Sequence, residues 1–241
     1  MQRNTMIVAV VLIVVVGGSL VVFLPQLLPR TEWRFQEGVT GNISVIVKEL
    51  ENCSITIEFV NDTGLMLKYS YIPGAGGVSV TQEPTNLGWM FTIGASTEGV
   101  VESGDLTITL GSSAVYSFFI RGDDLNVAIE YNEYSTLADH PAGDEFEMIS
   151  TGGTLDLTIS GASADLGYMQ AFSIDADNLA NANVDVILPT GTRGKVGLSD
   201  FMSIMTNNGW ARGVFYYEKG VETLPAVVIE VHADQYNAWL R

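Results

Sequence analysis

The most constraining feature of this sequence is a period-two alternation of apolar and polar residues that recurs from residue 42 to the end. In Ile43–Val47 and Ile55–Phe59 every second residue is apolar and most of the residues between are polar. Successive side chains of a β-strand point to opposite faces, so this pattern predicts strands with one buried face. The alternation returns in Leu65–Tyr71, Leu106–Leu110, Leu125–Tyr131, Leu155–Ile159, Val184–Leu188 and Val227–Val231.

Turn-forming clusters separate these runs. They are Asn61–Gly64, Pro73–Gly77, Gly122–Asp124, Thr151–Gly153, Pro189–Gly191 and Asn207–Gly209. The chain has 25 glycines and few apolar stripes of helical length, which argues against a long helix in this part. We therefore predict an all-β domain over residues 42–241, either a β-sandwich or a short β-solenoid of Gly-punctuated strands, with a possible sub-boundary near 95–104.

The amino-terminal segment carries a different signal. Met6–Leu24 is nineteen residues without a charge. As a helix it would be about 28 Å long, close to the roughly 30 Å of bilayer hydrocarbon. We predict one transmembrane helix over residues 6–28, ended by Pro25 and Pro29, with residues 1–5 as a cytoplasmic stub and 29–41 as a linker. The lipid bilayer would contact residues 6–24.

The flanking charges predict the orientation. Arg3 precedes the apolar run and no acidic residue occurs before Glu32, which favours a cytoplasmic amino terminus and an extracellular domain, although Arg30 and Arg34 follow the run. A cleaved signal peptide is the alternative, with small residues at Gly17–Ser19 near the cut. Leu20–Leu24 extends the apolar run past that site. Both interpretations export the remainder of the chain.

The charge balance excludes one class of partner. The chain has 28 Asp and Glu against 11 Lys and Arg, a net charge of −17, although only 16% of its residues are charged. Such a field repels polyphosphates, so nucleic-acid binding is excluded.

Two signals accompany export. Asn42, Asn52 and Asn61 each begin an Asn-x-Ser/Thr triplet, which leaves their glycosylation open. The single cysteine, Cys53, cannot form an internal disulfide. It begins a strand-like run, and we predict a buried small apolar residue there rather than a reactive thiol.

Two segments resemble each other. Gly104–Gly111 and Gly153–Ser160 each open with a glycine and place three apolar residues at alternate positions, and Asn183–Leu188 is a looser third copy. Such copies are typical of stacked rungs of a solenoid or serial strands of a sandwich. The spacing is irregular, and any alternating strand after a glycine would look similar.

The stretch Asn183–Gly191, followed by Gly194–Leu198, a turn at Asn208–Gly209 and a closing strand at Val227–Val231, resembles the toastrack-like, adhesin-type β domains. The resemblance covers residues 104–241. It implies a β domain of the cell envelope, often tethered by a transmembrane helix, that mediates contacts or assembly, and it brings no catalytic residues. The chain departs from that pattern in the helix-ambiguous Phe201–Met205 and in its long amino-terminal β region.

No catalytic, cofactor or metal site is predicted. The two histidines, His140 and His232, lack the ligand spacing of a zinc site, and Gly161–Asp165 lacks the second glycine of a nucleophile elbow. A Ser-His-Asp triad dispersed in the sequence stays open.

An acidic cluster stands near residues 122–147, comprising Asp123, Asp124, Asp139, Asp144, Glu145 and Glu147. Oxygen-rich loops can hold Ca²⁺, but this spacing matches no known calcium loop, and a solvated acidic face is the simpler interpretation. Arg121–Asp123, Leu188–Thr192 and Gly74–Gly77 superficially match integrin, sortase and phosphate motifs. We interpret all three as turns.

Consecutive aromatic residues indicate that both faces of some strands are covered. In Phe118–Phe119 and Phe215–Tyr217 neighbouring side chains must point to opposite faces. The cover is either a second sheet or a partner.

These observations predict a membrane-anchored, extracytoplasmic, β-rich protein that acts in binding, adhesion or envelope scaffolding without catalysis, with a protein or glycan partner at the cell surface. One alternative is a pilin-like or filament subunit, because an edge strand can pair with a neighbour. Another is an extracytoplasmic hydrolase with a dispersed site. The sequence leaves the ligand and the oligomeric state open.

Overall fold

The structure is a computed structural model in which Met1–Arg30 and Thr31–Arg241 form two separate units. It describes residues 31–35, 42–75, 77–86, 88–95, 99–112, 114–131, 146–149, 154–161, 172–188, 193–197, 201–220 and 226–241. The expected cytoplasmic stub and transmembrane helix over residues 6–28 lie outside these ranges. Within them, no helix reaches the length and apolarity that crossing a bilayer requires.

Every regular element of the described residues is a β-strand, so the predicted all-β class is confirmed. The strands are β1 (Thr31–Phe35), β2 (Asn42–Val60), β3 (Leu67–Ala75), β4 (Val78–Pro84), β5 (Gly88–Ala95), β6 (Val101–Gly111), β7 (Val115–Asp123), β8 (Leu125–Tyr131), β9 (Phe146–Ile149), β10 (Thr154–Gly161), β11 (Phe172–Ile187), β12 (Arg193–Gly197), β13 (Met202–Asn207), β14 (Ala211–Arg212), β15 (Tyr216–Lys219) and β16 (Ala226–Leu240).

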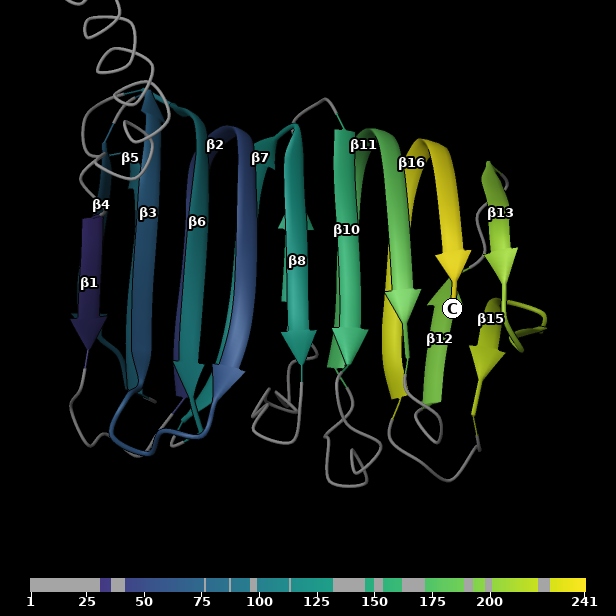
Figure 1. Ribbon diagram of the computed structural model, residues 1–241, viewed down its shortest axis with the longest axis horizontal. Coiled ribbons are helices and arrows are strands. Elements are labelled where there is room, and N and C mark those ends of the chain that lie inside the picture. Colours follow the sequence, from purple (N-terminus) through teal and green to yellow (C-terminus); the bar gives the residue numbers. More distant parts are fainter. Residues whose placement is uncertain are drawn as a thin grey trace, which may run out of the picture. The chain divides into compact units, whose positions relative to one another are not determined.

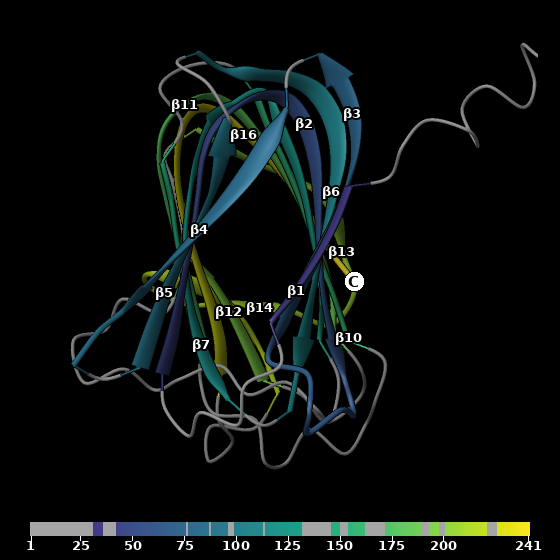
Figure 2. The same cartoon turned by 90° about the vertical axis from the view of Figure 1, so that its left-hand side faces the viewer.

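The strands form two facing layers, and the long strands cross from one layer to the other (Figure 2). In β2, Asn42–Val47 pairs with β5 and β7, whereas Leu50–Val60 pairs with β6 and Ser54–Glu58 with β8. Leu50 and Glu51, in the bend, also pair with β7. The bend between the halves contains Glu49 and Asn52, which have φ angles of 62° and 52°. Each left-handed residue adds one extra position between two inward-facing side chains. The strand therefore bends while its apolar side chains still face the core.

Parallel pairing stacks these two-layer units as rungs (Figure 1). Their order is β5–β6, β2, β7–β8, β9–β10, β11, β16 and β12–β13. Antiparallel strands cover the two ends of this stack. β3 and β4 pair with β6 and β5 at one end, and β15 pairs with β12 at the other. The described residues thus combine the facing layers of a sandwich with the parallel rungs of a solenoid.

The core consists of rows of apolar side chains that run across the rungs in register. One such row is Ile57, Ile108, Ile129, Ile159, Val186 and Leu240, all 0% exposed. Complete burial of each such side chain stabilises the fold by about 2 kcal/mol relative to exposure. The predicted alternation is therefore the signature of this core. The similar segments beginning at Gly104, Gly153 and Asn183 fall in β6, β10 and β11, which are strands of one layer.

The structure also differs from several expectations. The two short strands expected at Ile43–Val47 and Ile55–Phe59 are one continuous strand, β2. Residues 31–35 of the expected linker form β1, which pairs with β3. The helix-ambiguous Phe201–Met205 lies largely in β13. The region near 95–104 connects β5 to β6, consecutive strands of one rung.

Candidate functional site

Most of the large apolar side chains that are exposed in the described residues lie at one end of the stack. Six large apolar side chains are exposed among the described residues, and four lie between residues 201 and 215. Val214 is 83% exposed, Phe215 73%, Phe201 66% and Met205 56%. We call these four residues with Arg212 the end surface, because β13 and β14 are outer strands at this end of the stack. Exposed apolar groups of this kind mark contact surfaces.

A short hairpin holds Val214 and Phe215 away from the core. Its strands β14 and β15 pair antiparallel, and the Gly213 N–H donates to the Tyr216 carbonyl oxygen at 2.8 Å. This hydrogen bond closes a turn whose central residues are Val214 and Phe215. Their side chains consequently lie at a loop tip and are largely exposed.

The hairpin stands on a fixed base. Trp210 is buried at 5% exposure, and its backbone is held by the Asn207 side chain, which accepts from the Trp210 N–H at 2.9 Å and donates to its carbonyl oxygen at 3.1 Å. The Trp210 ring covers Gly194 so closely that a Cβ there would lie 2.5 Å from it. The tip is thus presented by a packed support rather than by a free loop.

Charged groups beside the hairpin are organised around Tyr216. Its hydroxyl donates to the Glu230 carboxylate at 2.6 Å, and the Lys195 ammonium lies 5.3 Å from the ring centroid and 3.8 Å from Glu218. The hydrogen bond to Glu230, with burial and neighbouring carboxylates, raises the pKa of Tyr216. Arg212, at the foot of the tip, is exposed.

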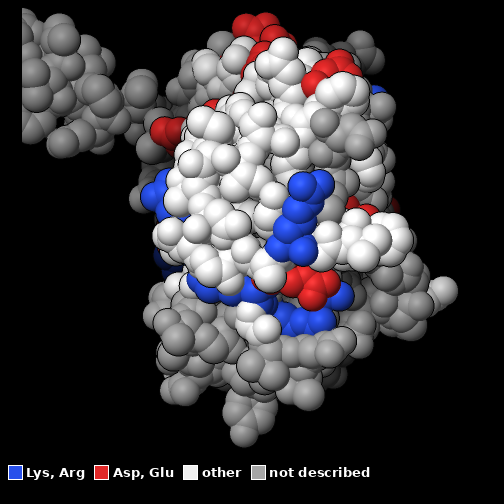
Figure 3. Space-filling view, turned by 90° about the vertical axis from the view of Figure 1, so that its right-hand side faces the viewer, with Lys and Arg blue, Asp and Glu red and all other residues white. Residues whose placement is uncertain are grey.

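This end differs in charge from the rest of the chain. Residues 193–241 hold five of the 11 Lys and Arg and five of the 28 Asp and Glu, so the whole net charge of −17 belongs to residues 1–192. Viewed from this end, most of the described surface is uncharged, and several Lys and Arg side chains lie on it together with fewer Asp and Glu (Figure 3). An anionic group therefore meets less repulsion here than elsewhere on the protein.

The second candidate site is a groove at the place where three rungs turn between the layers. We call it the corner groove. Its volume is about 390 Å³, and its lining is Lys48, Glu49, Leu50, Glu51, Val100, Arg121, Gly122 and Asp123. The strand pairing explains this assembly, because Leu50 is in register with both Val101 of β6 and Gly122 of β7. A Cβ on Gly122 would lie 2.4 Å from the Leu50 carbonyl oxygen, so this close approach requires glycine.

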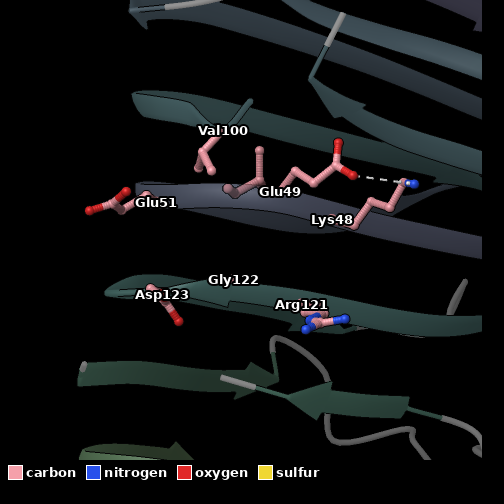
Figure 4. Close-up of a pocket in the computed structure, with 8 residues that line it drawn as sticks. Lys48, Glu49, Glu51, Val100, Arg121, Gly122 and Asp123 are labelled. Carbon is pink, nitrogen blue, oxygen red and sulfur yellow. Dashed lines mark ion pairs between the residues drawn. The ribbon is translucent and has the colours of Figure 1, made fainter. Parts of the chain in front are cut away.

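The charges in the corner groove are separated (Figure 4). Glu51 and Asp123 lie toward one end, and Lys48 and Arg121 toward the other. Lys48 pairs with Glu49 at 3.4 Å. Val100 contributes an apolar side chain that is 48% exposed. The groove can therefore accept an apolar group with a cation at its acidic end.

The sequence-predicted site residues are scattered. His232 is exposed on β16, whereas His140 lies outside the described residues. Of the acidic cluster, Asp123 lines the corner groove and Asp124 accepts the Thr154 N–H at 2.7 Å. The side chains of Asp139, Asp144, Glu145 and Glu147 are outside the described part. Among the described residues, no three potential ligands come together as a metal site.

The Arg121–Asp123 string does not form the expected turn. It ends strand β7, and Gly122 is buried against β2. Arg121 and Asp123 line the groove instead. Gly74 similarly belongs to β3, whereas Pro189–Thr192 lies outside the described residues.

Cys53 is buried as predicted. It is 2% exposed, and its thiol donates toward the carbonyl oxygens of Glu51 and Val101 at 3.3 and 3.5 Å. Burial raises the pKa of the Cys53 thiol, which disfavours the reactive thiolate. Of the glycosylation triplets, Asn52 and Asn61 are exposed and Asn42 is half-buried.

The two aromatic runs have different environments. Phe118 is 3% exposed in the core between the layers, whereas its neighbour Phe119 is half-buried. Phe215 is exposed. Sequence reasoning selected Phe215 through its aromatic neighbours but missed Val214 and Met205. The apolar pair directly after Gly213, inside a turn, was the available signal.

No protein-family model and no curated protein matches this chain. A solved structure is similar in fold, the crystal structure of a “putative cell adhesion protein” from Clostridium sporogenes. The similarity has a TM-score of 0.56 at 11% sequence identity, and it covers 88% of this chain and 97% of the other. At this identity the likeness concerns the fold alone.

Proposed function

We propose that this chain is a β-rich binding or adhesion protein of the cell envelope that acts without catalysis, and that the end surface makes its contact. The exposure of Val214 and Phe215 on a hydrogen-bonded, well-supported tip carries this proposal. Burying one such side chain contributes about 1.5–3 kcal/mol. A turn normally displays polar residues, so a rigid apolar tip is best explained by a partner that covers it.

The fold supports the same role. The similar solved structure is described as a “putative cell adhesion protein”, in agreement with the adhesin-type resemblance of residues 104–241. Because one fold serves many functions, the proposed binding role depends on the residues of the end surface. For the catalytic alternative, no three His, Cys, Asp or Glu side chains of the described residues come together as a metal site.

The location belongs to the same proposal. Residues 6–24 anchor the chain in a bilayer, the amino terminus is cytoplasmic and the β domain is outside. The strand order starts at β1 and ends at β14, so the chain enters the stack at the end remote from the end surface.

Membrane fractionation tests the location. The full chain should stay with membranes after an alkaline wash, and protease added to intact cells should remove residues beyond about 30. Release of a shortened, soluble chain would identify a cleaved leader instead. Protection of the β domain in intact cells would contradict export.

Binding to envelopes tests the contact surface. The fluorescently labelled full chain, in detergent, is titrated onto isolated cell envelopes together with the double variant Val214→Ser/Phe215→Ser. We expect the double variant to bind at least tenfold more weakly, because its tip no longer buries apolar surface. Ile187→Ser, which alters an apolar side chain 37% exposed on β11, is the matched control and should bind normally. Equal binding of all three proteins would exclude the end surface.

The absence of catalysis is tested separately. A broad hydrolase screen compares the full chain with His140→Ala and His232→Ala. We expect no activity above background in any of the three. Activity that either substitution abolishes would establish the hydrolase alternative.

A further inference from the structure

We infer that the end surface of one copy docks into the corner groove of a second copy, so that the chain assembles head to tail. This inference rests on the proposed function, since it names the partner of the end surface. It brings together two features of the described residues, the exposed apolar tip of the end surface and the corner groove.

The apolar parts match. Four of the six exposed large apolar residues in the described ranges belong to the end surface, and a fifth, Val100, lines the groove. The groove has a volume of about 390 Å³. The side chains of Val214 and Phe215 can enter it and cover Val100. This exchange removes apolar surface from water on both copies.

The charges are complementary as well. Arg212 adjoins the apolar tip, and Glu51 and Asp123 lie together at one end of the groove (Figure 4). Lys48 and Arg121 lie toward the other end of the groove, away from Glu51 and Asp123, and Lys48 is paired with Glu49 at 3.4 Å. The distribution of net charge also favours this contact, because residues 1–192 carry the entire net charge of −17 and residues 193–241 are neutral. The carboxyl-terminal end is therefore the part of one copy that can best approach the acidic body of another.

The topology requires two copies. The groove lies on rungs β5–β6, β2 and β7–β8, whereas the tip belongs to the β14–β15 hairpin beyond the last rung, β12–β13. Four rung spacings separate β7–β8 from β12–β13, about 19 Å at roughly 4.8 Å per spacing. A tip on a fixed base cannot reach the groove of its own chain. Because the two surfaces differ, each copy keeps one of each free, and the contact repeats into a ring or a filament. A filament subunit was one alternative from the sequence.

A charge exchange tests the contact directly. Sedimentation velocity of the full chain in detergent should show concentration-dependent association. Arg212→Glu and Glu51→Arg should each weaken it at least tenfold, since each places like charges at the contact. The combined variant Arg212→Glu/Glu51→Arg should recover most of the association, because every contact again joins opposite charges. Residues 6–24 are the same in all proteins, so their contribution cancels in the comparison.

A second set of variants tests the apolar residues of the proposed contact. Val214→Ser/Phe215→Ser and Val100→Ser should both reduce association at least tenfold, whereas Ile187→Ser should leave it unchanged. Far-ultraviolet circular dichroism verifies that each variant is folded. Association that survives the double tip variant, or a charge exchange that restores nothing, would overturn the inference.

The failure of this inference is distinguishable from that of the proposed function. If the unaltered chain stays monomeric while the tip variant still loses binding to envelopes, self-docking is rejected and a different envelope partner is retained. If the tip variant changes neither measurement, both proposals fail.

Discussion

At the scale of single residues, Tyr116 links two parts of the core through its phenol. The hydroxyl donates to the carbonyl oxygens of Met66 and Gly111, the latter at 2.7 Å, and the side chain is 0% exposed. Burial raises the pKa of Tyr116 well above its usual range. The proton is thus held more tightly in the folded protein than in the unfolded chain.

This gives a pH-dependent prediction for Tyr116→Phe. At pH 8 the variant should be less stable by about 1–2 kcal/mol, because a buried carbonyl oxygen loses its donor. The phenol's contribution is complete below about pH 10, where the unfolded tyrosine titrates, and declines above it by up to about 1.4 kcal/mol per pH unit. The difference between the two proteins should therefore narrow above pH 10. Denaturant unfolding from pH 7 to 11 measures it.

Tyr217→Phe is the matched control, because Tyr217 is a half-buried tyrosine of β15. Its effect should be small at pH 8. A stability gap for Tyr116→Phe that stays constant or widens from pH 9 to 11 would contradict the assigned role of the phenol.

At the scale of elements, the bends between layers depend on left-handed residues. Four residues other than glycine have positive φ in the described part, namely Glu49, Asn52, Ser103 and Asp124, and all lie near a passage between layers. This conformation costs about 1–2 kcal/mol for most side chains, whereas asparagine and aspartate adopt it more readily. Glu49 and Ser103 therefore hold strained positions.

Glu49→Gly should consequently stabilise the protein by about 1 kcal/mol, measured by chemical unfolding. The lost pair with Lys48 is solvent-exposed and offsets little of this gain. Asn52→Gly, in the same bend, should have a smaller effect because asparagine tolerates the left-handed region. A clear loss of stability in Glu49→Gly would show that its side chain supports the bend.

The bends also show why the strands were predictable and their continuity was not. Ile43, Val45 and Val47 are buried as their alternation predicts, but the next inward residues are Leu50 and Cys53, each three positions on. The apolar alternation is interrupted at the two charged residues Lys48 and Glu49. In the sequence, this interruption resembles a polar loop between two short strands. Only pairing with rungs on both sides reveals a single strand that changes layer. Pairing partners distant in sequence leave no trace in local periodicity.

The end surface illustrates the same limit for function. The pattern of Phe215, Tyr216 and Tyr217 requires that some aromatic leave the common face, but it does not say which. The structure distinguishes them, since the Tyr216 hydroxyl is held by Glu230 while Phe215 projects from the tip. The corner groove could not be predicted at all, because three strands separated by up to 75 positions line it.

At the scale of the whole molecule, the order of rungs departs from the order of the chain. β2 is the first long strand, yet it lies between β5–β6 and β7–β8. β16 is the last strand, yet it lies between β11 and β12–β13. The early and late segments of the domain are therefore interior to the stack. In a sequential solenoid each repeat contacts only its neighbours in the chain, so terminal repeats can fray independently.

We accordingly predict one cooperative unfolding transition for the β domain. Far-ultraviolet circular dichroism, with a β-type spectrum, and tryptophan fluorescence should give coincident denaturation curves, since neither terminal rung can separate without opening a central pair. A chain ending at Pro225, which lacks β16, should lose the transition entirely because β11 and β12 then have no common partner. Replacing residues 211–219 with a Gly-Ser linker removes only outer strands and should preserve a single transition at a lower midpoint. Separate transitions for the two probes, or a cooperative transition without β16, would show that the rungs fold as independent repeats.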